Sequence, residues 1–141
     1  MNSRSFLICD FAMSDLRRSG GMSEIVQAKL NSTGETCALK FSRRGDSDSQ
    51  AVASFSREAN ALSDISHRNI VRLLGIGTDG AKRFLALEWL EETLSDYILS
   101  IGPMEWPSFY ENVGRPILEG LEHAHGLSLI HISEPTRQAE I

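Results

Sequence analysis

The stretch LRRSGGMSEIVQAKLNSTGETCALKF, residues 16–41, decides the fold because it alternates strand-like runs with turn chemistry. Residues 25–30 and 36–41 are strand-like, and the NSTG of residues 31–34 between them is typical of a turn. Residues 11–18 form an earlier strand-like run that ends just before a Gly-Gly pair. The pattern predicts an antiparallel meander of three strands.

Downstream of this meander, the sequence predicts one helix and another pair of strands. A polar loop over residues 42–50 precedes apolar residues at helical spacing, namely Val52, Phe55, Ala59 and Leu62. Residues 70–74 and 84–88 are typical of strands, and Asp79-Gly80 between them is a strong hairpin signal. We therefore expect about five strands and one helix in this part of the chain.

From residue 93 onward the pattern changes to that of helices. Thr93 is expected to cap a helix over residues 94–98. A second, longer apolar stripe follows at helical spacing: Trp106, Phe109, Tyr110, Val113, Ile117, Leu121 and Ala124. Pro116 interrupts this stripe, and a proline inside a helix costs about 3 kcal/mol. We expect a kink near Val113 or a later helix start.

Composition excludes several classes of protein. The 141 residues are 41% hydrophobic and 23% charged, which is ordinary globular composition. The 14 Lys and Arg residues against 19 Asp and Glu residues give a net charge of −5, dispersed along the chain, which argues against nucleic acid or an anionic membrane as partner. The apolar run over residues 6–9 ends at Asp10 and is too short for a signal peptide or a membrane span. We expect a cytoplasmic protein.

The cysteines and histidines do not indicate a metal site. Cys9 and Cys37 are the only cysteines and have no CxxC spacing, so we expect both to be reduced core residues. His123 and His125 are two residues apart and would not share a helix face. We expect these histidines to lie on the surface near a helix end.

Three features could carry chemistry, although each also has an ordinary structural explanation. Gly20-Gly21 between two strands could let backbone N–H groups approach a phosphate, or could simply form a hairpin turn. Lys40 ends a strand, where a lysine is usually just solvated. Glu58 lies beside Phe55 and Leu62 on the predicted helix, so it is either a solvated edge residue or a partly buried carboxylate with a cationic partner.

In combination and order, these features resemble the small lobe of a eukaryotic-type protein kinase domain. The resemblance includes the Gly-rich turn, the Ala-x-Lys strand, the helix glutamate, the HRNIV of residues 67–71 and the apolar strand ending in Glu88. It covers about Leu16 to Gly126. It implies an α+β fold, with a five-stranded antiparallel sheet and one helix followed by the first helices of the large lobe.

The same resemblance implies a nucleotide site for ATP. In this family a glycine loop covers the phosphates, a strand lysine contacts the α- and β-phosphates, and a helix glutamate pairs with that lysine. By position, Gly20, Gly21 and Ser23 take the loop role, while Lys40 and Glu58 form the catalytic pair. Other residues would surround the base: Ile25 and Ala38 over its apolar faces, Leu87 behind it, and the backbone of Glu88 and Leu90 bonded to it.

The match also departs from the family pattern. The first family glycine is replaced by Arg18 and the third by Ser23, and Arg18 is bulkier and less free in its backbone torsions. We expect phosphate affinity or loop closure to suffer from this change.

A remote alternative is dinucleotide binding, because Gly75, Gly77 and Gly80 fit GxGxxG after a strand, with Asp96 about twenty residues further on. That chemistry requires a helix that begins at the glycines, whereas residues 84–87 look like the return strand of a hairpin.

The sequence lacks the catalytic machinery that follows in a kinase. The chemistry needs a catalytic-loop Asp, an Asn, and the Asp of Asp-Phe-Gly for Mg²⁺. His131 matches the family histidine, but Ile132 and Ser133 stand where its Arg and Asp belong. The LSLIHISEPTR of residues 127–137 resembles the translation of a transposase-type sequencing adapter. We therefore expect residues 127–141 to be an artefactual tail.

These expectations define four segments: an N-terminal extension (1–10), a kinase small lobe and hinge (11–90), the start of a helical large lobe (91–126), and the tail (127–141). The parent protein is expected to transfer the γ-phosphoryl group of Mg-ATP to protein Ser or Thr hydroxyls. The chain as written is expected to be inactive and to contain no metal site of its own. The alternative is a non-catalytic, pseudokinase-like module that binds nucleotide or protein.

Overall fold

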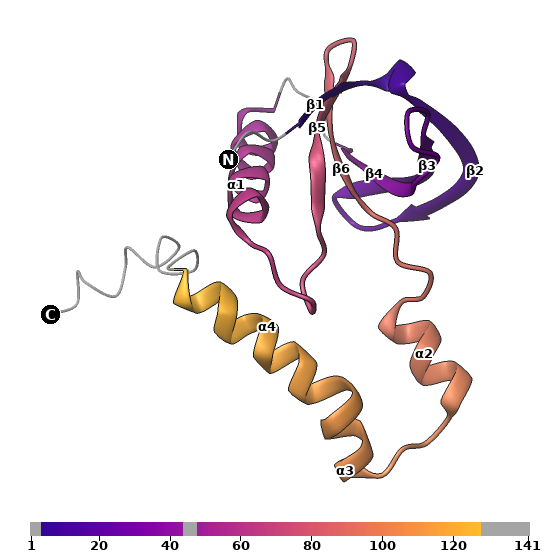
Figure 1. The fold of residues 1–141 in the computed structure, drawn as a ribbon, viewed down its shortest axis with the longest axis vertical. Helices are drawn as coiled ribbons and strands as arrows, with labels where there is room; N and C mark the ends of the chain where they lie inside the picture. The colour runs from indigo at the N-terminus through magenta and orange to yellow at the C-terminus, as the bar shows by residue number, and fades with distance from the viewer. Residues whose placement is uncertain (1–3, 44–47, 128–141) are drawn as a thin grey trace, which may run out of the picture. The chain divides into compact units, whose positions relative to one another are not determined.

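The chain forms two compact units. The computed structural model describes residues 4–43 and 48–127. The first unit comprises Met1–Asp64 and Val71–Glu91 and contains the β-sheet, and the second comprises Ile65–Ile70 and Glu92–Ile141 and contains the later helices (Figure 1). The expected tail at residues 128–141 lies outside the described residues.

The first unit is built on a six-stranded mixed sheet with the strand order β1-β5-β6-β4-β3-β2 (Figure 1). The strands are β1 (Arg4–Leu7), β2 (Phe11–Ser19), β3 (Ser23–Leu30), β4 (Thr36–Ser42), β5 (Leu73–Asp79) and β6 (Lys82–Glu88). The predicted meander is confirmed, because β2, β3 and β4 pair antiparallel in sequence order. The α+β class predicted from the sequence is also confirmed.

The expected count of five strands was one short. Strand β1 lies within the segment expected to be only an N-terminal extension, and it pairs parallel with β5, with Ser5 opposite Ile76. A 3₁₀ turn, η1 (Ile8–Asp10), connects it to β2. Phe6 fixes β1 to the sheet, since its ring packs edge-on against Phe11 at a centroid distance of 5.2 Å.

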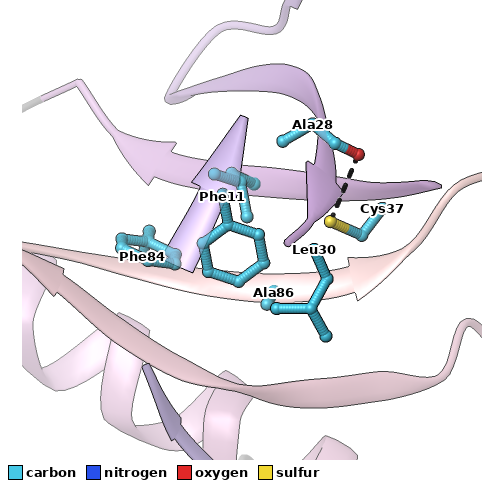
Figure 2. Close-up of a cluster of buried hydrophobic side chains, with 7 residues drawn as sticks. Phe11, Ala28, Leu30, Cys37, Phe84 and Ala86 are labelled. Atoms are coloured by element: carbon cyan, nitrogen blue, oxygen red, sulfur yellow. Dashed lines mark hydrogen bonds between the residues drawn. The ribbon is translucent and has the colours of Figure 1, made fainter. Parts of the chain in front are cut away.

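Each face of the sheet carries its own apolar cluster. One cluster consists of Phe11, Ala28, Leu30, Cys37, Leu39, Phe84 and Ala86 (Figure 2). We call it the aromatic-face cluster, because the Phe84 ring packs edge-on against Phe11 and at a tilt against Phe41. The other cluster consists of Ala38, Ala59, Leu85 and Leu87, and we call it the helix-face cluster.

Helix α1 (Ser49–Asp64) covers the helix-face cluster. Its Phe55 and Leu62 pack against that cluster, and Ala59 is buried in it. The helix follows the sequence expectation closely, since the apolar residues at helical spacing are those that meet the sheet.

Gly75 and Gly77 are explained by packing. A Cβ at Gly77 would overlap the Phe84 ring, and a Cβ at Gly75 would overlap the Arg4 carbonyl on β1. The chain then turns at Gly80, whose φ of 59° favours glycine, and returns as β6. The dinucleotide alternative is therefore wrong, because a strand and a hairpin stand where it requires a helix.

The second unit consists of short helical segments: α2 (Leu94–Ile101), α3 (Trp106–Phe109), the π-helical segment η2 (Tyr110–Gly114) and α4 (Arg115–Gly126). Thr93 caps α2 as predicted, because its hydroxyl accepts a hydrogen bond from the Asp96 N–H at 3.1 Å. The expected irregularity near Val113 is confirmed as the π-helical turn, and Pro116 follows that turn directly, at the second residue of α4. Within the described ranges, no helix has the length and hydropathy that a bilayer-spanning segment requires.

Two expectations about individual side chains were partly wrong. Cys37 is buried as expected, but Cys9 is exposed, because it belongs to the η1 turn rather than to a strand that faces the core. His125 is exposed as expected, whereas His123 is half-buried and stacks on His67 at a centroid distance of 4.8 Å. This contact arises because residues 65–70 approach α4 closely at Gly120.

Candidate nucleotide site

The centre of the candidate site is an ion pair between β4 and α1. Lys40 Nζ donates a hydrogen bond to Glu58 Oε1 at 2.6 Å. The two side chains retain 28% and 38% of their exposure, so the pair is reachable from solvent. The structure therefore favours the cationic partner that the sequence offered for Glu58 over a solvated edge position.

Strand register places the sequence-predicted residues on one face of the sheet. Arg18 lies opposite Ile25, Ile25 opposite Lys40, and Lys40 opposite Leu85. Residues directly opposite each other share a face, and so do residues two apart along a strand. Ala38 and Leu87 therefore lie on this same face, paired with each other. It is the face that carries the helix-face cluster.

A cavity of about 450 Å³ opens beside the ion pair. Its lining residues are Met22, Ser23, Lys40, Phe41, Ser42, Gln50, Ala51, Ser54, Phe55, Arg57, Glu58 and Leu85. The structure thus brings Ser23 to the Lys40–Glu58 pair. The residues assigned to the base are not part of this lining: Ile25, Ala38, Leu87, Glu88 and Leu90.

The sequence interpretation missed the contribution of the first turns of α1. Gln50, Ser54 and Arg57 line the cavity beside Glu58. Their spacing of four and three residues places them on one side of the helix, and this periodicity was a usable signal. Arg57 adds a second cation to the lining, so two positive groups and one carboxylate face the cavity. This charge balance suits a negatively charged ligand.

The turn between β2 and β3 forms one wall near the cavity. The Gly20 N–H donates to the Ser23 carbonyl at 3.0 Å, and the Arg43 N–H donates to the Met22 carbonyl at 3.1 Å. The described glycines with positive φ are Gly34, Gly80 and Gly102, so Gly20 and Gly21 are not held in that conformation. A Cβ at Gly21 would meet nothing within 4 Å. The fold itself therefore does not require this glycine pair.

The segment after β6 is the other edge of the candidate site. Leu87 is buried, while the Glu88 carboxylate accepts a hydrogen bond from the Arg72 N–H at 2.8 Å. The Glu88 N–H donates in turn to the Arg72 carbonyl at 3.0 Å. The Glu88 side chain thus holds the loop that precedes β5.

Arg18 reaches this same segment from β2. Its Nη1 donates to the Leu90 carbonyl at 3.1 Å, and its Nη2 donates to the Glu91 carbonyl at 3.0 Å. The guanidinium also lies 4.6 Å from the centre of the Trp89 ring. Sequence reasoning identified Arg18 only as a departure from a glycine, because a contact across 72 residues leaves no local signal.

Cys37 lies on the opposite face, in the aromatic-face cluster, and takes no part in the site. Its Sγ donates weakly to the Ala28 carbonyl at 3.4 Å (Figure 2). Burial, followed by the nearby Glu35 carboxylate, raises the pKa of the Cys37 thiol to about 11. The thiol is therefore neutral at physiological pH and is not a nucleophile.

Known proteins with similar sequences are protein kinases. Cysteine-rich receptor-like protein kinase 34 of Arabidopsis thaliana is 30% identical over 128 residues, which is 86% of this chain and 18% of the relative. Serine/threonine-protein kinase pkn3 of Myxococcus xanthus is 36% identical over 118 residues, which is 79% of this chain and 21% of the relative. The chain thus spans about a fifth of the length of these curated relatives.

A solved structure shares the fold. The crystal structure of Rad53 1-466 in complex with AMP-PNP matches with a TM-score of 0.67 at 24% sequence identity, over 83% of this chain and 31% of that chain. A family model described as the protein kinase domain matches residues 18–132, which is most of the sequence. This match extends from the end of β2 through α4 and covers more than half of the chain, so the chain belongs to the protein kinase domain family.

Proposed function

We propose that this chain is the nucleotide-binding portion of a protein Ser/Thr kinase and that its cavity receives the phosphates of ATP. The observation that carries the proposal is the Lys40–Glu58 pair, 2.6 Å apart at the wall of the 450 Å³ cavity. A lysine side chain alone is conformationally loose, and an opposing carboxylate fixes where its charge points. A phosphate entering the cavity would thus meet a positioned cation.

Two further observations support this proposal. The fold does not require Gly21, and a close approach of a ligand to the backbone would explain a glycine there. The solved structure with the same fold carries AMP-PNP, according to its title. We assign the phosphate end to Gly20, Gly21, Ser23, Lys40 and Glu58. We assign the purine end to Ile25, Ala38, Leu87 and the backbone of Glu88 and Leu90.

Mg²⁺ does not fit the residues that the structure describes around the cavity. Among the lining residues of the cavity, Glu58 is the single carboxylate, and it is bonded to Lys40. Within the described residues there is no group of three or more His, Cys, Asp or Glu side chains that could hold a metal ion. Phosphoryl transfer to a Ser or Thr hydroxyl is therefore proposed only for the parent protein, whose catalytic-loop Asp and metal ligands this sequence lacks.

Calorimetric titration of the 141-residue chain with ATP tests the assignment. Lys40→Met should lower the affinity by at least about tenfold, because hydrogen bonds to charged groups contribute about 1.5–3 kcal/mol. Lys29→Met is the matched control, since Lys29 is an exposed lysine on β3 that does not line the cavity. Equal ATP affinity in the unsubstituted chain and in the Lys40→Met variant, with unchanged circular dichroism, would overturn the assignment of the site.

A further inference from the structure

Arg18 makes a connection that the usual glycine at its position could not make. Its guanidinium donates to the Leu90 and Glu91 carbonyls at 3.1 and 3.0 Å and stacks over Trp89. These three contacts join β2, which leads into the glycine turn, to the segment after β6. We call this set of contacts the Arg18 clasp.

The clasp lies on the face of the sheet that carries the candidate site. Arg18 is directly opposite Ile25, which in turn is opposite Lys40. Its side chain therefore leaves the sheet on the side assigned to the purine and ends on the backbone of Leu90. That backbone is one of the groups to which the proposed function assigns the base.

The clasp and the cavity are formed by different residues of this face. At the Lys40 end, the structure has an open cavity of about 450 Å³. At the Leu90 end, the residues assigned to the purine do not line that cavity, and the Arg18 guanidinium is bonded to the carbonyl of Leu90 instead. Near Lys40 a cavity is open to a ligand, whereas near Leu90 the Arg18 side chain is bonded to a backbone group assigned to the purine.

We propose, on the basis of the proposed function, that Arg18 restricts access to the purine end, because its side chain must release Leu90 before an adenine ring can bind there. Nucleotide binding then includes the cost of opening the clasp, which lowers the affinity of the closed chain. The contacts are exposed, so we expect the penalty to be about five- to tenfold in affinity.

The experiment compares adenosine with AMP-PNP, because adenosine has no phosphates and reports on the purine end alone. Arg18→Ala should tighten the binding of both ligands by the same factor of about five to ten. Lys40→Met should weaken AMP-PNP and leave adenosine unchanged. Arg17→Ala is the matched control, since Arg17 neighbours Arg18 in sequence but pairs with Glu24 at 3.2 Å.

Fluorescence provides a second measurement that does not depend on the phosphate site. In a Trp106→Phe background, Trp89 is the only tryptophan. Arg18→Ala removes the stacked guanidinium, so the Trp89 emission should change. Adenosine should produce a similar change in the chain that retains Arg18 and little change in the Arg18→Ala variant.

The outcomes separate this inference from the proposed function. Equal or weaker adenosine binding after Arg18→Ala would overturn the clasp while leaving the Lys40 assignment intact. An unchanged Trp89 emission after Arg18→Ala would overturn the clasp as well, because it would show that the stacked contact does not form. Insensitivity of AMP-PNP to Lys40→Met would overturn the proposed phosphate site. Tighter adenosine binding in Arg18→Ala, together with the fluorescence change, would support the clasp.

Discussion

The sheet of the first unit and the helices of the second unit treat their apolar side chains differently. In the sheet, Phe84 and Leu39 have no exposed surface, and every buried hydrophobic residue that the structure describes lies in the first unit except Val113. In the helices, Leu99 is 80% exposed and Trp106 is 71% exposed. The sheet thus encloses a core on both faces, whereas the helices present much of their apolar stripe to solvent.

This difference indicates where the stability of the chain originates. Burial of apolar surface contributes roughly 25 cal/mol per Å², so a unit that encloses its side chains gains far more than one that exposes them. Exposed apolar faces of this kind also favour association with other apolar surfaces. We expect the first unit to resist denaturant while the second unit contributes little to cooperative unfolding.

The largest expected effect is the loss of the Phe84 ring. Phe84→Ala should lower the free energy of unfolding by about 3–5 kcal/mol, because Phe84 belongs to the aromatic-face cluster and the removal of its ring leaves a cavity there. Leu99→Ala is the matched control in the second unit and should change it by less than about 0.5 kcal/mol. Urea unfolding followed by circular dichroism measures both, and similar losses would break the contrast between the two units.

A smaller effect on the free energy of unfolding is expected from the Cys37 thiol, whose pKa depends on how well the same cluster excludes water. Its pKa is raised from 9.0 to about 11 in the folded chain, so the folded state keeps its proton longer than the unfolded state does. The buried, neutral Cys37 thiol makes its full contribution to the free energy of unfolding below pH 9. This contribution is lost as the pH rises towards 11, because the unfolded state loses its proton first. The loss amounts to about 3 kcal/mol at most, at 1.36 kcal/mol for each pKa unit.

The Cys37 prediction is tested by measuring the free energy of unfolding of the unsubstituted chain and of the Cys37→Ala variant from pH 8 to 11 and taking the difference. Subtracting the two curves removes the titration of other groups, and Cys9→Ala serves as the exposed control. A difference that does not vary with pH would mean that the cluster admits water and that the sheet is less enclosed than its geometry indicates.

Overpacking the same cluster should cost somewhat less. Gly77→Ala places a methyl group against the Phe84 ring, so the ring must shift, at a cost of about 1–3 kcal/mol. Gly21→Ala is the control, because a Cβ there meets nothing within 4 Å and should change stability by no more than about 0.5 kcal/mol. Equal melting temperatures for the two variants would show that Gly77 is not required by packing.

Local patterns predicted much of the fold. The meander, helix α1, the Thr93 cap and the Gly80 hairpin each arise from residues close together in sequence, where spacing and turn chemistry carry the signal. The structure departs from expectation at β1, whose four residues pair in parallel with a strand about seventy residues away. Neither its length nor its composition distinguishes it, because the partner that stabilises it is remote.

The candidate site shows the same division between local and remote signals. Lys40 and Glu58 follow from a strand end and a helix face, and the structure joins them. The clasp contacts of Arg18 and the cavity lining from α1 depend on how separate elements meet, so a single sequence reveals them only in part. What Arg18 does could not be predicted from its position, since its hydrogen-bond partners are backbone carbonyls, which are the same for every residue type.

The smallest expected effect comes from surface charge, and it tests whether apolar burial alone separates the two units. In the second unit, Arg115 and Glu111 pair at 2.7 Å with both side chains more than half exposed. In the first unit, Arg17 and Glu24 pair at 3.2 Å and are also largely solvated. Double-mutant cycles should give coupling energies of about 0.3–0.5 kcal/mol for the first pair and a similar value for the second. If one pair instead coupled by several times this amount, ion pairing as well as burial would have to be counted in the contrast between sheet and helices.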